Sequence, residues 1–113
     1  MSIRWEYISR KIIREEDMEE FLRMEGLGPE ITDDSTEVIE LANENGFVSF
    51  LVDPPGLIYF IRKEDVPYII VDKKNFSVYY KGQENYDIVL FDTREKIEAF
   101  EKELDLIRND DNT

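Results

Sequence analysis

The chain changes its hydrophobic period at Gly46, and this change limits the folds that are open to it. Between Glu15 and Gly46, apolar residues recur every three or four positions, which is the period of an amphipathic helix. After Gly46, short apolar runs separated by turn signals follow one another, which is typical of consecutive strands. These runs cover residues 47–52, 57–62, 67–72, 76–80 and 86–92.

The connections between these runs predict hairpins. Residues 53–56 read Asp-Pro-Pro-Gly, in which proline fixes φ and glycine permits a positive φ. Lys-Lys-Asn at 73–75 separates the next two runs, and Gly-Gln-Glu-Asn at 82–85 precedes the last one. Because short connections join neighbouring antiparallel strands, we expect four consecutive strands from this region to form one continuous meander.

A short strand and a helix are predicted near the start of the chain. Apolar and charged residues alternate over residues 3–7, as in a strand with one apolar face. From Glu15 the period becomes helical, so that Met18 and Leu22 lie on one side. The sequence Gly-Leu-Gly-Pro at 26–29 is expected to end this helix.

Two further helices are predicted, and the start of each has the spacing of a capping box. Asp34 stands three residues before Glu37, and this helix is expected to end at Gly46, where glycine accepts a left-handed conformation. Asp92 stands three residues before Glu95 at the start of the last helix, which carries a regular apolar stripe.

These elements together predict an α+β fold in the order β-α-α-β-β-β-β-α. We expect an antiparallel sheet of four to five strands, a β-meander, with two N-terminal helices and one C-terminal helix packed on one face. The length of 113 residues suits one hydrophobic core. We therefore expect residues 1–108 to form a single domain and residues 109–113 to be a disordered tail.

The negative charge of the chain is concentrated in about a third of its length. The formal net charge is −13. Residues 15–53 contain thirteen acidic residues and a single basic one, Arg23. The negative electrostatic potential of this segment disfavours nucleic acids and anionic membranes as ligands, and it favours a cationic partner.

The composition argues against most catalytic chemistry. The chain has no cysteine and no histidine, which removes thiolate nucleophiles, the usual proton carrier near neutral pH and the commonest ligands of transition metals. Phosphate-binding glycine loops and serine-nucleophile motifs are missing. Asp33, Asp34 and Glu37 lack the register of a calcium loop. We therefore expect a protein that is not an enzyme and that holds no cofactor or metal.

Direct nucleic-acid binding and membrane insertion are not expected either. Lysines and arginines near the tyrosines of the β-rich region stand at turns, where lysine commonly prevents the pairing of sheet edges; they are Arg62, Lys63, Lys73, Lys74 and Lys81. No apolar run approaches the length of a membrane span, and the first residues lack the apolar core of a signal peptide. We expect a cytoplasmic protein.

The acidic residues of the two N-terminal helices form the candidate partner-binding site. Like charges four residues apart on a helix repel each other, as at Glu16 and Glu20, so stability alone does not favour this arrangement. The predicted site consists of Glu15, Glu16, Glu19, Glu20, Asp33, Asp34, Glu37, Glu40 and Glu44.

We expect this site to cover a cationic site on a basic partner protein, such as a toxin, a nuclease or a nucleic-acid-binding protein. Small acidic immunity proteins, antitoxins and inhibitors use this complementarity of charge, and the likeness to them is one of size and charge only. Exposed aromatic residues would supply buried contact area, and the candidates are Trp5, Tyr59, Tyr68, Tyr79, Tyr80 and Tyr86. The alternative is a structural or adaptor domain in which the acidity only serves solubility. The sequence leaves the partner's identity and the oligomeric state open.

Overall fold

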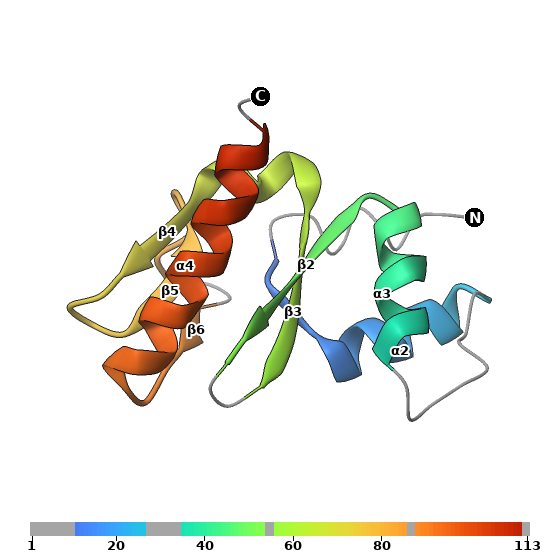
Figure 1. Cartoon of the computed structure of the whole chain (residues 1–113), viewed down its shortest axis with the longest axis horizontal. Coiled ribbons are helices and arrows are strands. Elements are labelled where there is room, and N and C mark those ends of the chain that lie inside the picture. Colours follow the sequence, from blue (N-terminus) through green and yellow to red (C-terminus); the bar gives the residue numbers. More distant parts are fainter. Residues whose placement is uncertain (1–10, 27–34, 54–55, 86–87, 112–113) are drawn as a thin grey trace.

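The computed structural model describes residues 11–26, 35–53, 56–85 and 88–111, and these residues form an α+β fold (Figure 1). The strands form two antiparallel three-stranded sheets. In spatial order, sheet A consists of β1 (Ile13–Arg14), β3 (Leu57–Arg62) and β2 (Phe47–Val52), and sheet B consists of β4 (Ile69–Asp72), β5 (Ser77–Tyr80) and β6 (Val89–Leu90). The helices are α2 (Glu15–Met24), α3 (Ser35–Glu44), the 3₁₀-helix η1 (Lys63–Tyr68) and α4 (Arg94–Asp111).

The α+β class is confirmed, but the prediction of one continuous meander is wrong. β2 pairs with β3 and β4 pairs with β5, so both predicted hairpins form. Between β3 and β4, however, the chain makes the 3₁₀-helix η1, which contains Pro67. Proline has no N–H to donate to a strand ladder and fixes φ near its helical value. The helix η1 therefore carries the chain from sheet A to sheet B, and β3 and β4 do not pair.

The outer strands also differ from the prediction. The strand expected at residues 3–7 lies outside the described residues, whereas the unpredicted β1 pairs with β3 through Ile13 and Phe60. The strand expected over 86–92 is shorter: β6 spans Val89–Leu90, and residues 86–87 lie outside the described part. β5 begins one residue later than expected because Phe76 has a left-handed φ of 53°.

Both faces of sheet A are covered, so the expectation of all helices on one face is wrong. Along β2, Phe47 packs with α2 and α3, whereas Phe50 and Val52 pack with α4 and sheet B. Figure 1 shows α2 and α3 on one side of the β2–β3 pair and α4 with sheet B on the other. The physical reason is that β2 and β3 carry apolar side chains on both faces, and each face needs a cover.

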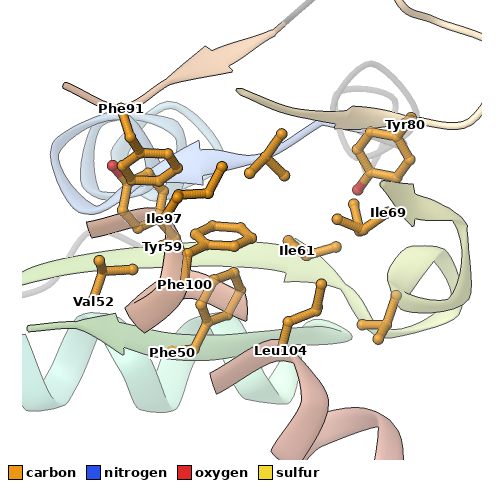
Figure 2. Close-up of a cluster of buried hydrophobic side chains, with 12 residues drawn as sticks. Phe50, Val52, Tyr59, Ile61, Ile69, Tyr80, Phe91, Ile97, Phe100 and Leu104 are labelled. Atoms are coloured by element: carbon orange, nitrogen blue, oxygen red, sulfur yellow. The ribbon is translucent and has the colours of Figure 1, made fainter. Parts of the chain in front are cut away.

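An aromatic cluster fills the space between sheet A, sheet B and α4 (Figure 2). The ring of Phe100 on α4 lies 4.8 Å from that of Phe50 and 5.6 Å from that of Tyr59, centroid to centroid, and both contacts are edge-to-face. Phe91 closes the cluster at 5.5 Å from Phe100. Such pairs add stability beyond the area they bury. This cluster holds α4 and the two sheets together.

The limits of α4 differ from those predicted. The hydroxyl of Thr93 accepts a hydrogen bond from the Lys96 N–H at 3.3 Å, so Thr93 caps the helix and the predicted cap at Asp92 is wrong. Asp92 instead forms an ion pair with the Lys96 side chain at 2.7 Å. The helix ends at Asp111. The single domain over residues 1–108 and the tail over residues 109–113 stay predictions.

Candidate functional site

The helix α2 separates apolar and acidic side chains onto opposite sides. Met18 and Leu22 are fully buried against sheet A. At 3.6 residues per turn, Glu16 and Glu20 lie on the opposite side, and both are exposed. The sequence predicted this separation. In the structure, the acidic side of α2 faces the solvent.

The helix α3 repeats the same arrangement. Val38 and Ala42 are buried in the same core cluster as the apolar side of α2. Glu40 and Glu44 are exposed on the other side, whereas Glu37 is half-buried at the flank. The apolar side of α3 packs mainly on β2 through Phe47.

The two helices therefore share one orientation relative to sheet A. One core cluster joins the buried sides of both helices to one face of the sheet, so their exposed sides face solvent together. We call the four exposed glutamates that lie opposite these buried positions the acidic outer face, and they are Glu16, Glu20, Glu40 and Glu44. Because their helices are held by a packed core, the carboxylates are carried on a rigid layer.

Little of the acidic charge is neutralised from within the described part of the chain. Arg23 forms an ion pair with Glu19, one turn earlier on α2. The other ion pairs of the described residues lie on β3–η1, the β4–β5 turn and α4, and none of them includes a residue of the acidic outer face. Within the described ranges, the four carboxylates therefore have no basic side chain that neutralises them.

The structure does not bring every predicted site residue into this face. Glu15 is half-buried on the side of α2 that faces sheet A, and both it and the exposed Glu16 line a cavity of about 140 Å³ between the start of α2 and the β2–β3 turn. Glu19 is engaged by Arg23, and Glu37 sits at the flank of α3. Asp33 and Asp34 lie outside the described residues, together with the predicted cap of α3.

The aromatic residues proposed as contact anchors do not join the acidic outer face. Tyr59 and Tyr80 are buried, so they do not meet the condition of exposure set for a contact anchor; the Tyr80 hydroxyl donates to the carbonyl oxygen of Lys11 at 3.2 Å. Tyr68 is 52 % exposed, but it lies at the junction of η1 with sheet B. Tyr79 belongs to sheet B as well, and Trp5 and Tyr86 lie outside the described residues.

Met24 is an exposed apolar residue beside the acidic outer face that the sequence reasoning missed. Its side chain is 54 % exposed at the end of α2, one turn beyond Glu20 and on the same side of the helix. Methionine is enriched in the cores of protein interfaces because its flexible side chain fits irregular surfaces. The sequence could have identified Met24, because the helical period places it opposite the buried Met18 and Leu22.

The groups with shifted pKa values lie away from the acidic outer face. Burial raises the pKa of the Tyr59 hydroxyl above 10.0, and the neighbouring Arg14 guanidinium opposes this effect. A hydrogen bond from the Asn75 side chain lowers the pKa of Asp72, and one from Lys96 lowers that of Asp92. In both aspartates these donors stabilise the ionised carboxylate.

The described residues contain neither a candidate metal site nor a helix suited to span a membrane. No group of three or more acidic side chains within these ranges has an arrangement that could hold a metal ion. Within the same ranges, no helix combines the length and the apolar character that crossing a bilayer requires.

The arrangement presents fixed negative charge and a neighbouring apolar side chain at one surface, which suits recognition of a cationic group. Comparison with protein-family models, with curated proteins and with solved structures finds no match to this chain.

Proposed function

We propose that this protein is a non-catalytic binding protein whose acidic outer face covers a cationic site on a basic partner protein. The observation that carries the proposal is the set of four exposed carboxylates on two packed helices, none of which forms an ion pair with a described basic residue. The partner class is a toxin, a nuclease or a nucleic-acid-binding protein, since these proteins display lysines and arginines that normally meet phosphates.

Electrostatic complementarity gives this surface its expected mechanism. A face of one sign of charge steers an oppositely charged partner and raises the association rate by about 10–1,000-fold at low salt. The carboxylates need little reorganisation on binding because α2 and α3 are already ordered by their core. Once docked, the helices block the cationic site by occupying it, and no bond is made or broken.

Charge alone does not give a tight complex, because desolvation offsets much of the Coulomb attraction. The apolar contribution is expected from Met24, which lies beside the carboxylates on the outer side of α2. We expect Met24 to enter an apolar depression of the partner next to its basic residues. Its truncation should then accelerate dissociation, whereas loss of a carboxylate should mainly slow association.

The test is affinity capture from a lysate of the native host with two variants of equal charge. In the first, Glu16, Glu20, Glu40 and Glu44 are changed to glutamine. In the control, exposed acids elsewhere are changed to the corresponding amides, namely Glu84, Glu95, Glu98 and Asp105. Both variants lose four negative charges, so a difference between them reports position and not net charge.

We expect basic proteins to be recovered with the wild type and with the control variant. They should be lost with the variant in which the acidic outer face is changed to glutamine. Recovery should also fall steeply as salt rises, because screening weakens charge pairs at a surface. Equal recovery with the two variants would contradict the proposal. It would favour the alternative in which the acidity only provides solubility.

A further inference from the structure

The connection between α3 and β2 contains a reactive pair of residues, an asparagine followed by a glycine. α3 ends at Glu44 and β2 begins at Phe47, so Asn45 and Gly46 alone join the helix to the sheet (Figure 1). Asparagine is chemically labile, because the backbone nitrogen of the next residue can attack its side-chain amide. The pair Asn-Gly occurs once in the sequence, at this junction.

The reaction at this pair requires no group beyond the two residues and water. The Gly46 nitrogen, once its proton has passed to a base in the solvent, attacks the side-chain carbonyl carbon of Asn45. A carbon–nitrogen bond forms, the bond to the side-chain nitrogen breaks and ammonia leaves, so that a five-membered succinimide ring remains. Water then opens this ring at either carbonyl and yields aspartate or isoaspartate. Nothing is oxidised or reduced.

The surroundings of Gly46 favour this attack. Gly46 is exposed and has a left-handed φ of 91°, and a Cβ placed on it would meet no atom within 4 Å. The attacking nitrogen therefore belongs to a residue without a side chain, in open surroundings that water and base can reach. Asn43 and Asn75 are followed by Glu44 and Phe76, whose side chains crowd the corresponding nitrogen.

Two hydrogen bonds of the folded chain oppose the attack. The side-chain Nδ2 of Asn45 donates to the carbonyl oxygen of Leu41 at 2.7 Å, which holds the amide against the last turn of α3. The N–H of Gly46 donates to the carbonyl oxygen of Asn43 at 3.2 Å, which retains the proton that must be lost. Both bonds have to be released before the Gly46 nitrogen can reach the side-chain carbon of Asn45.

We propose that Asn45 is a site of spontaneous deamidation and that its own contact with the end of α3 sets the rate. In the native state the reaction proceeds through conformations in which the last turn of α3 has opened, and helix ends open more readily than a packed core. The fold therefore slows a reaction that the sequence favours. This modification is independent of whether the acidic outer face binds a partner.

The product changes the junction permanently. A carboxylate at position 45 cannot donate to the Leu41 carbonyl, and it adds negative charge at the end of α3, where the helix dipole is unfavourable and the last turn has no basic residue. Isoaspartate also lengthens the backbone by one carbon next to Gly46, whose carbonyl oxygen accepts from the Lys63 N–H at 2.9 Å. Deamidation should therefore loosen α3 on sheet A.

The experiment is incubation of the full chain in mildly alkaline buffer, with and without enough urea to unfold it, followed by peptide mapping with mass spectrometry. We expect Asn45 to be converted in both conditions, but roughly tenfold faster or more in urea, because unfolding releases both hydrogen bonds. In urea, Asn45 should also be converted faster than Asn43 and Asn75. No conversion at Asn45, equal rates in the two conditions, or faster conversion of Asn43 or Asn75 in urea would overturn the proposal.

A variant that loosens α3 tests the restraint by the fold. Val38 is buried beneath α3 and lies away from the reacting atoms, and Leu106 is exposed on α4. Val38→Ala should raise the rate at Asn45 several-fold in the native state and leave the rate in urea unchanged, whereas the control Leu106→Ala should change neither rate. An unchanged native rate in Val38→Ala would show that the end of α3 does not control the reaction.

A pair of variants with equal charge tests the consequence. Asn45→Asp reproduces the product, and Asn43→Asp adds the same charge at an exposed position of the same helix. We expect Asn45→Asp to lower the urea midpoint of unfolding by more than Asn43→Asp does, because only the former loses the bond to Leu41. Equal midpoints would show that the amide of Asn45 does not hold the end of α3.

Discussion

The guanidinium of Arg108 on α4 donates a hydrogen bond to the carbonyl oxygen of Ile69 at 2.5 Å. The same group also donates to the carbonyl oxygen of Val66 at 3.2 Å. Val66 lies in η1 and Ile69 begins β4, so one side chain joins the late part of α4 to the point where the chain passes from sheet A to sheet B. This passage is the feature that divides the expected meander into two sheets.

Replacing Arg108 by alanine should therefore destabilise the fold. Hydrogen bonds to a charged donor contribute about 1.5–3 kcal/mol, and the partial exposure of Arg108 reduces this, so we expect a loss of about 1–2 kcal/mol in the free energy of unfolding. Urea titration measures the loss, and hydrogen exchange at β4 locates it. Arg108→Lys should retain part of the stability because one ammonium can still reach one carbonyl. A loss as small as that of an ordinary surface substitution would show that the contact is not stabilising.

Phe100→Ala should be the most damaging single truncation in the core. Phe100 contacts the rings of Phe50, Tyr59 and Phe91 and is fully buried. Truncation of a buried phenylalanine costs about 3–5 kcal/mol, because transfer energy is lost and a cavity remains. Leu106→Ala on the same helix is the control, and we expect it to change stability by less than about 0.5 kcal/mol because Leu106 is exposed. Similar losses for the two variants would contradict the assigned core.

Local patterns in the sequence predicted the three α-helices of the described residues and the hairpins β2–β3 and β4–β5. The periods of α2, α3 and α4, and the turns at 53–56 and 73–75, each depend on neighbouring residues whose chemistry is visible in the sequence. The left-handed Gly26 and Gly46 stand at the helix ends where they were expected. Propensity and periodicity are local, so they suffice for these elements.

The arrangement of the two sheets could not be predicted because it depends on contacts between distant residues. A single proline in the run 67–72 reads as an ordinary strand start, yet Pro67 lies inside η1 and the chain changes sheet there. β1 is only two residues long, and its pairing with β3 has no periodic signal. The shared orientation of Glu16, Glu20, Glu40 and Glu44 likewise required both helices to be placed on one face of sheet A.

The ion pair between Asp92 and Lys96 predicts a pH dependence of stability. The Lys96 partner lowers the pKa of Asp92 below its ordinary value of 3.8. A carboxylate with a lowered folded-state pKa adds stability above its unfolded pKa, and this contribution is lost as pH falls through the folded value. The coupling in a double-mutant cycle of Asp92→Asn and Lys96→Met should therefore be favourable at pH 7 and decrease on acidification below about pH 4. Coupling that is unchanged by acid would show that the pair does not act through ionised Asp92.

The substitution Glu44→Lys should raise stability while it weakens docking. Glu40 and Glu44 are like charges one turn apart, and the last turn of α3 contains no basic residue. A lysine at position 44 replaces this repulsion by an attraction to Glu40 and complements the helix dipole, so we expect a gain of about 0.5 kcal/mol at low salt. Glu44→Gln removes the repulsion between positions 40 and 44 without adding an attraction, so it should give about half of the gain. Urea titration at low salt and in 1 M NaCl checks whether the gain in stability is electrostatic, because an electrostatic gain shrinks as salt rises.

A gain in stability together with weaker capture of basic proteins would mean that Glu44 is kept for binding at a cost in stability. Unchanged capture would show that Glu44 does not belong to the proposed site.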